Sequence, residues 1–221
     1  MSTNPIELAL VRHEQSIGNI EKTWMGARTD SKLSELGRRQ AEATGIYLKR
    51  FTPQIRAIYT SPLSRARLTA DIISKHVGVP VKAMQSLIEV DMGDLEGKTS
   101  DEVLRSYPDI LSFLEPDATT PIPGGESAAA VAQRVSEALL QIAQNQAPSE
   151  KTVVVSHQGA IMIGLSALLE DKSSVMNYQL SNCGVTWISF GSRPEIIELD
   201  HIEHLTSAGI NTRPWDPRSD L

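Results

Sequence analysis

The stretch Ile6-Glu7-Leu8-Ala9-Leu10-Val11 is a short apolar run that ends directly in the pair Arg12-His13. A second run of this kind, Thr152-Val153-Val154-Val155-Ser156, ends directly in His157. Short, almost continuous apolar runs are typical of strands that are covered on both faces, as in a parallel sheet. The carboxyl ends of such strands form the ligand-binding edge of an open α/β sheet. We therefore expect Arg12, His13 and His157 to converge at that edge.

Helical patterns separate the strand-like runs. Apolar residues recur at three-to-four spacing over residues 36–51 and again over 131–142, as on one face of an amphipathic helix. Ser61-Pro62 supplies a hydroxyl N-cap and a proline at the first helical position, which predicts a helix over 62–77 with Arg65 in its first turn. This alternation predicts an α/β fold, a three-layer sandwich with a mainly parallel sheet and helices on both faces. Further strands are expected at residues 55–60, 79–83, 184–190 and 194–199.

Length, composition and charge limit the class of protein. The chain has 221 residues, of which 40% are hydrophobic and 22% charged, as is usual for a globular protein. Its formal net charge is −6 and its Lys and Arg residues are scattered, which argues against nucleic-acid or membrane-surface binding. The single cysteine, Cys183, excludes an intrachain disulfide and fits a reducing compartment. We see no signal peptide and no apolar run as long as a membrane span, so we expect a cytoplasmic protein.

We expect a single domain over residues 1–221 with two additions. Residues 92–126 contain four prolines and the pair Gly124-Gly125, which predicts a helical and loop insertion over one edge of the sheet. Loops of this kind commonly select the substrate. Residues 205–221 are expected to form an extended tail. An apolar edge strand and this tail offer surfaces from which a homodimer could be built.

The chemistry of the expected edge points to phosphate. An arginine in the first turn of a helix adds its charge to the free N–H groups there, so Arg65 favours an anion. Arg12 and Arg65 together could grip a phosphate bidentately with charges that do not titrate away. A neutral imidazole whose other nitrogen donates to a carbonyl can attack phosphorus. The pattern therefore predicts a site that binds and moves a phosphoryl group.

Four motifs follow one another along the chain and identify a family. They are Leu10-Val11-Arg12-His13-Glu14-Gln15-Ser16-Ile17-Gly18-Asn19, Thr60-Ser61-Pro62-Leu63-Ser64-Arg65, Leu87-Ile88-Glu89-Val90-Asp91-Met92-Gly93-Asp94-Leu95-Glu96-Gly97 and Val155-Ser156-His157-Gln158-Gly159. In these motifs and their order the chain resembles the histidine phosphatase (phosphoglycerate mutase-like) superfamily, over roughly residues 6–190. The resemblance implies a role for each matching position. His13 corresponds to the nucleophile that becomes phosphorylated, and Glu89 to the proton donor. Arg12, Arg65 and His157 correspond to the phosphate pocket, and the substrate-binding positions are Asn19, Met25, Gly26 and Gln158.

The reaction so implied uses neither a metal nor a cofactor. A metal held by His13, His157 and Glu89 is disfavoured because two arginines at the same place would repel a dication. The leaving alkoxide needs a proton, which a carboxylic acid can supply before it acts as base for water. We therefore predict a metal-independent phosphomonoesterase that hydrolyses a small phosphorylated metabolite through phosphohistidine.

Two alternatives stay open. The family usually has glycine where this chain has Glu14, and a carboxylate aimed at the phosphate would weaken anion binding. The first alternative is therefore a catalytically impaired, phosphate-binding regulator. The second is a phosphoglycerate mutase-type transferase, although residues 98–123 hold a single arginine, Arg105, too little positive charge for a doubly anionic intermediate. Outside the main motifs, Trp24, Arg28 and Met92 are expected to line the substrate site, Arg67 to be structural, His76 to cap a helix, and His201 and His204 to lie on the surface.

Overall fold

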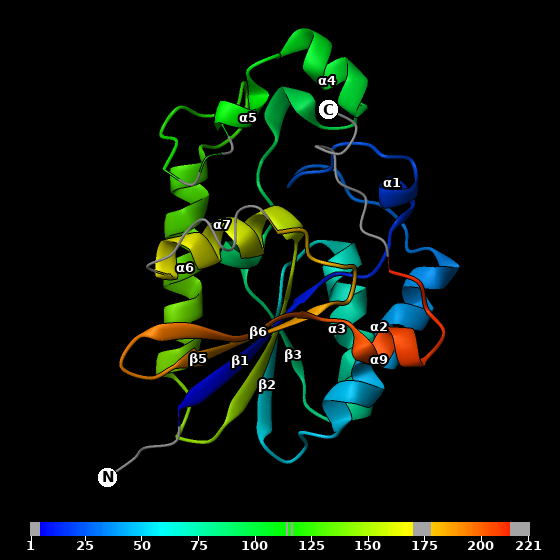
Figure 1. The fold of residues 1–221 in the computed structure, drawn as a ribbon, viewed down its shortest axis with the longest axis vertical. Coiled ribbons are helices and arrows are strands. Elements are labelled where there is room, and N and C mark those ends of the chain that lie inside the picture. The colour runs from blue at the N-terminus through cyan, green and yellow to red at the C-terminus, as the bar shows by residue number, and fades with distance from the viewer. Residues whose placement is uncertain (1–4, 114, 116, 170–177, 213–221) are drawn as a thin grey trace.

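The computed structural model describes residues 5–113, 115, 117–169 and 178–212 (Figure 1). These residues form one six-stranded sheet in the order β3-β2-β4-β1-β5-β6. β2 runs parallel to both of its neighbours, β3 and β4, and β4 runs parallel to β1. β5 runs antiparallel to β1 and to β6. The strands are β1 (Ile6–Arg12), β2 (Ile55–Thr60), β3 (Val81–Ala83), β4 (Lys151–Ser156), β5 (Val185–Phe190) and β6 (Pro194–His201).

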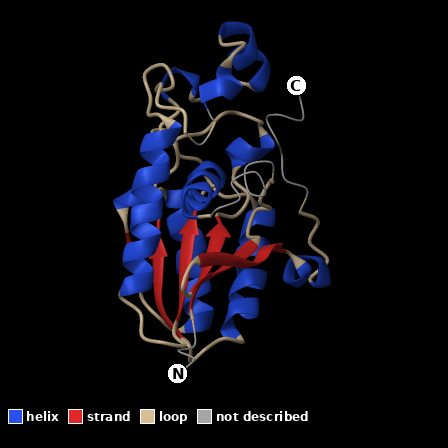
Figure 2. Ribbon diagram, turned by 60° about the vertical axis from the view of Figure 1, so that its left-hand side comes forward, coloured by secondary structure: helices blue, strands red, loops and turns tan. Residues whose placement is uncertain are grey.

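Helices cover both faces of this sheet, as Figure 2 shows from the side. On one face α2 and α3 pack against Ala9, Val11 and Val155, and on the other α6 and α7 pack against Leu8 and Leu10. The alternation of β1 between the two layers follows from the two-residue period of a strand. The predicted three-layer α/β sandwich with a mainly parallel sheet is confirmed. The helices are α1 (Ile17–Ile20), α2 (Glu35–Lys49), α3 (Ser64–Val77), α4 (Ser100–Ser106), α5 (Ile110–Phe113), α6 (Ala128–Gln144), α7 (Gln158–Leu168) and α9 (Glu203–Ser207), with 3-10 turns η1 (Gln85–Leu87) and η2 (Gly93–Leu95).

The start of α3 differs from the prediction. Its N-cap is Leu63, without a side-chain cap, so the assignment of Ser61 as the N-cap is wrong. Proline disfavours helical conformation in the residue before it, and here Ser61 and Pro62 stay outside the helix. Arg65 nevertheless lies in the first turn of α3, as expected.

The segment after β6 also differs from the prediction. Residues 205–207 belong to the short helix α9, so the extended conformation expected from Leu205 onward is wrong there, and residues 213–221 lie outside the described part of the chain. Leu205 and Ile210 are buried in a small apolar cluster with Ala41 of α2 and Cys183. This cluster anchors the segment to the body of the domain.

Three histidines outside the main motifs are placed differently from the prediction. His201 and His204 are half-buried, and their rings stack on Tyr47 with centroids 4.6 Å and 4.8 Å from its ring. Burial, which disfavours the charged imidazole, lowers the pKa of His204 to about 4. The surface assignment of this pair is therefore wrong. His76 contacts Glu42 of α2 at 2.6 Å, so its observed partner is a neighbouring helix and not the end of its own.

Residues 92–126 form η2, α4 and α5 with intervening loops. They extend beyond the sheet layers at one end of the molecule (Figure 1). Across the described ranges, no helix combines the length and the apolar character that crossing a bilayer requires.

Candidate active site

His13 follows β1 and is held by main-chain contacts. Its N–H donates to the carbonyl of Ser156 at the end of β4 (2.9 Å), and its Nδ1 lies 2.7 Å from the carbonyl oxygen of Glu14. Since a carbonyl only accepts, Nδ1 carries the ring proton and Nε2 keeps its lone pair. Burial, and then the charges of Arg65 and Arg12, lower the pKa of His13 well below its usual range. The ring is therefore a neutral imidazole with an unprotonated Nε2.

His157 stands at the N-cap of α7 with its ring edge-on to that of His13, the centroids 5.1 Å apart. Its Nε2 lies 2.7 Å from Oγ of Ser61. That oxygen also accepts the N–H of Leu63 (3.3 Å), and it can either donate to Nε2 or accept from it, according to the tautomer of His157. Nδ1 itself is buried without a hydrogen-bond partner in the structure. Burial, followed by the charge of Arg65, lowers the pKa of His157 well below its usual range.

Arg12 and Arg65 are both buried and are held mainly by carbonyl oxygens. Arg12 donates to the carbonyl of Leu180 (2.5 Å) and Arg65 to those of Thr29 (2.8 Å) and Gly26 (3.0 Å). Burial lowers the pKa of Arg12 to about 10 and also lowers that of Arg65, so both guanidiniums stay charged at neutral pH. Carbonyls orient a guanidinium without neutralising it, so Arg12 retains its positive charge for an anion, whereas Asp30, 3.3 Å from Nη1 of Arg65, offsets part of the charge of Arg65. Nε of Arg12 is buried and has no hydrogen-bond partner.

Glu89 is 7% exposed and is ordered by backbone N–H groups. Its Oε1 accepts from Val90 (2.9 Å) and Ala160 (2.8 Å), and its Oε2 accepts from Gly159 (3.2 Å). Two of these donors lie in the first turn of α7, where the helix dipole is positive. The contacts fix the carboxyl beside the residues that follow His157.

The structure places the four predicted substrate-binding residues around this group. Gln158 accepts from Arg12 (3.4 Å), and Gly26 gives its carbonyl to Arg65. Asn19 forms the capping box of α1 with Ser16, and Met25 lies against Gly18. The structure thus brings Arg12, His13, Arg65, Glu89 and His157 together, whereas a direct role in substrate binding for the other four stays a prediction.

Sequence reasoning missed several residues that support the site through main-chain groups. Nδ2 of Asn182 donates to the carbonyl of His13 (2.9 Å), and the N–H of Cys183 donates to the carbonyl of Arg12 (2.9 Å). Both precede β5, an antiparallel strand whose beginning meets the edge at which β1 ends. An antiparallel assignment of residues 185–190 would have been the signal for them.

The charges that act most strongly on Glu14 lie on α2 and are not those of Arg12 and Arg65. Its side chain is fully buried, and neither carboxyl oxygen has a hydrogen-bond partner. Burial raises the pKa of Glu14 to about 7, and the charges that act on it are those of Arg38 and Glu42 on α2. These charges place its carboxyl toward α2, which argues against direct repulsion of a bound phosphate, and whether Glu14 impairs catalysis stays a prediction.

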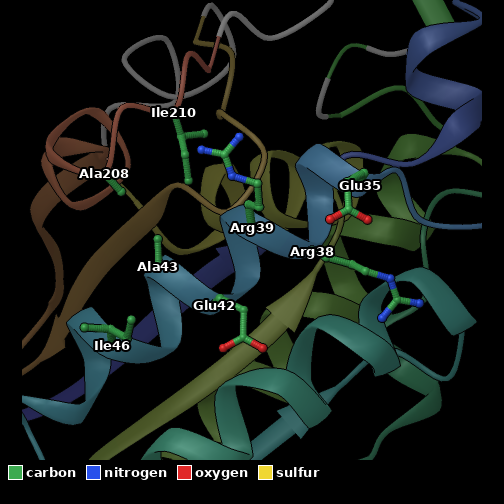
Figure 3. Close-up of a pocket in the computed structure, with 8 residues that line it drawn as sticks. All are labelled: Glu35, Arg38, Arg39, Glu42, Ala43, Ile46, Ala208 and Ile210. Carbon is green, nitrogen blue, oxygen red and sulfur yellow. The ribbon is translucent and has the colours of Figure 1, made fainter.

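Arg38 and Glu42 also line a separate hollow of about 340 Å³ between α2 and the segment after α9 (Figure 3). Two arginines and two glutamates line it together with apolar residues, so their charges balance. No group of three or more His, Cys, Asp or Glu side chains that could hold a metal ion occurs within the described residues.

Comparison with known proteins now identifies the family. Residues 8–200 match the sequence model of the histidine phosphatase superfamily (branch 1). The chain belongs to this superfamily. The Bacillus subtilis protein named uncharacterized phosphatase PhoE is 33% identical over 184 residues, 83% of this chain and 88% of that one. A 2,3-bisphosphoglycerate-dependent phosphoglycerate mutase of Brucella melitensis is 34% identical over 167 residues, 74% of this chain and 81% of that one.

A solved structure is similar over most of both chains. The phosphoserine phosphatase of Entamoeba histolytica, in complex with 3-phosphoglyceric acid, aligns with a TM-score of 0.79 and 28% identity, covering 90% of this chain and 99% of that one. The predictions of the superfamily, of its α/β sandwich and of an enzyme of the phosphoric monoester hydrolase class are therefore confirmed.

Proposed function

We propose that this histidine phosphatase hydrolyses small phosphomonoesters without a metal, through a phosphohistidine formed on His13. The observation that carries the proposal is a pair of buried polar atoms without partners among the described residues, Nε of Arg12 and Nδ1 of His157, on two residues that adjoin a neutral His13. Buried polar groups are normally hydrogen-bonded, so unpartnered nitrogens on two neighbours of His13 support a polar ligand. With Arg65 beside them, a phosphate is the ligand that fits their charge.

In the first step, the guanidiniums of Arg12 and Arg65 bind the phosphate oxygens and place phosphorus in line with Nε2 of His13. The lone pair of Nε2 forms the N–P bond while the bond from phosphorus to the ester oxygen breaks. Protonated Glu89 gives its proton to the departing alkoxide, and positive charge around the equatorial oxygens stabilises the transition state.

In the second step, water attacks the phosphorus of the phosphohistidine. Glu89, now a carboxylate, takes a proton from that water, and the N–P bond breaks as its electrons return to Nε2. Inorganic phosphate leaves, and neutral His13 is restored. The main-chain donors that fix Glu89 suit it to both proton transfers because they keep its oxygens in place beside His157.

Transfer of the phosphoryl group to a second substrate is the competing function, because a Brucella relative is named as a mutase. We favour hydrolysis because Arg105 is the single arginine of residues 98–123. The Entamoeba relative, solved with 3-phosphoglyceric acid, supports a small phosphorylated acid as the substrate class to test first.

The test is turnover of an aryl phosphate and of a panel of phosphorylated metabolites in the presence of a chelator. We expect release of inorganic phosphate, lost by at least about 10³-fold in His13→Ala with its folding retained. Full activity in that variant contradicts the proposal. Label passing from bisphosphoglycerate to phosphoglycerate favours the mutase, and phosphate binding without turnover, with turnover gained in Glu14→Gly, favours the regulator.

A further inference from the structure

Glu96 is the residue around which the loop of residues 26–30 is folded. Its Oε2 accepts both the N–H (2.6 Å) and the hydroxyl (2.7 Å) of Thr29, and the N–H of Arg28 lies 3.1 Å from each carboxyl oxygen. Its Oε1 also accepts the N–H of Met92 (3.3 Å). One carboxylate thus orders consecutive peptide groups of a loop that is far from it in the sequence.

The same loop holds Arg65. The two carbonyls that accept from its guanidinium belong to Gly26 and Thr29, at the two sides of the segment that Glu96 binds. Asp30 adds a third contact, at 3.3 Å from Nη1 of Arg65, and also accepts the N–H of Ser64 at the start of α3 (2.6 Å). The orientation of the guanidinium is therefore set by loop 26–30 as well as by the helix that carries it.

The close approach of Glu96 explains the glycine at position 26. A Cβ on Gly26 would lie 2.3 Å from Oε1 of Glu96 and 2.6 Å from the carbonyl oxygen of Val90, distances that side-chain atoms do not tolerate. The next residue, Ala27, donates its N–H to the same carbonyl (3.0 Å). The loop that holds Arg65 is thus also tied to the segment that carries Glu89.

We propose that Glu96 is a positioning residue for the reaction. Through the peptide groups of Arg28 and Thr29 it holds the carbonyls that aim Arg65 at the phosphate. The inference rests on the proposed function, in which Arg65 stabilises charge on the equatorial oxygens. If the guanidinium of Arg65 turns by a small amount, it stabilises the transition state less well, and this loss is larger than the loss in substrate binding. The reason is that the geometry of the contact matters most where charge develops.

The test compares Glu96→Gln with a matched control, Asp94→Asn, an exposed acid in the adjoining 3-10 turn. Glutamine keeps one acceptor oxygen but replaces the other with an NH₂ group, which in either orientation of the amide faces N–H donors and cannot accept from them. We expect kcat/KM for an aryl phosphate to fall about 10–100-fold in Glu96→Gln, mainly in kcat, with weaker binding of inorganic phosphate. The control is expected to keep both values within about twofold, and the melting temperatures of the two variants to be similar. Equal kinetics in the two variants overturn the proposal.

A double-mutant cycle separates positioning from general damage to the fold. If Glu96 acts through Arg65, adding Glu96→Gln to Arg65→Lys costs much less than it costs in the wild-type chain. Independent, multiplying losses contradict the proposal. The cycle is run on kcat/KM and, by calorimetry, on the affinity for inorganic phosphate. If the wild-type enzyme binds phosphate but does not hydrolyse esters, the proposed hydrolysis is wrong. The positioning role of Glu96 is then decided by the double-mutant cycle on phosphate affinity. Equal kcat/KM and equal phosphate affinity in the wild type and Glu96→Gln end positioning alone, and no phosphate binding by the wild type ends both.

Discussion

Glu14, which follows His13, and Glu89, which binds the residues after His157, are two buried carboxyls with opposite surroundings. Glu89 accepts three backbone N–H groups, two of them at the start of α7. Glu14 accepts none, and burial raises its pKa to about 7. A carboxyl that accepts from fixed donors has defined oxygen positions, which is what contact with a substrate requires. A buried carboxyl without donors destabilises the folded state. The comparison teaches that burial alone does not fix the oxygens of a carboxyl, which in Glu89 are held by main-chain donors and in Glu14 are not.

The largest effect that tests this difference is expected from Glu89→Gln. Loss of the proton donor should lower kcat/KM by about 10²–10⁴-fold on an alkyl phosphate, whose alkoxide leaves only when protonated. On an aryl phosphate the loss in kcat/KM should be much smaller because a phenolate leaves readily without a proton, whereas kcat should fall on both esters because Glu89 is also the base of the second step. Steady-state kinetics on both esters measure the contrast. Equal losses in kcat/KM on the two would show that Glu89 has another role.

A smaller loss is expected when the donors are kept and the Glu89 carboxyl is displaced. The Cβ of Gly159→Ala would lie 2.8 Å from Oε1 of Glu89, so the acid must shift. We expect kcat to fall about tenfold with little change in stability, since alanine is favoured over glycine in a helix. Gly191→Ala is the matched control because a Cβ there meets no atom within 4 Å. An unchanged kcat in Gly159→Ala would mean that the carboxyl position is not critical.

At Glu14 the expected effect is on stability and not on rate. The pKa of the Glu14 carboxyl is about 7 in the folded protein, above its value in the unfolded chain. The stability that the protonated carboxyl contributes is therefore fully present below the unfolded pKa and is lost as the pH rises through the folded pKa. Glu14→Gln should therefore raise the free energy of unfolding by about 1–3 kcal/mol at pH 8 and change it little at pH 4. Urea unfolding at the two pH values measures this, and activity should stay within about threefold. A large loss of activity would place Glu14 in the catalytic machinery.

The dependence of the free energy of unfolding on pH below about 6.5 has a different cause, the buried neutral histidines, and gives the smallest expected change. His13, His157 and His204 are neutral in the folded protein and have lowered pKa values, so the unfolded chain binds more protons below its ordinary value of about 6.5. Stability should fall as pH drops below that value. His204→Phe keeps an aromatic ring on Tyr47 and should reduce the loss at pH 5 by about 1 kcal/mol. If this variant loses as much stability at pH 5 as the wild type, the role given to His204 is wrong.

The residues that could be predicted from sequence follow strands directly. Arg12 is the last residue of β1, and His13 and His157 come directly after β1 and β4, so a general rule of sheet geometry brings them together. Arg65 could be predicted from the helix that follows β2, although the predicted N-cap of that helix was wrong. A shift of the helix start by one or two residues still leaves Arg65 in the first turn.

The residues that escaped prediction depend on contacts between distant loops. No periodicity in the sequence indicates that Glu96 orders loop 26–30, since the contact joins its carboxylate to peptide groups. Asn182 was missed because it precedes a strand that turned out to be antiparallel. His204 was misplaced because its partner, Tyr47, lies on α2, more than 150 residues earlier in the chain. The oligomeric state stays a prediction.

The most direct test of the account is capture of the phosphoenzyme. The wild-type protein is mixed briefly with labelled substrate, quenched in alkali, digested and analysed by mass spectrometry. We predict a phosphoryl group that is stable in alkali, labile in acid, located on His13 and absent from His13→Ala. Rapid turnover by an enzyme that never carries this label, or a label that persists in His13→Ala, would contradict the account.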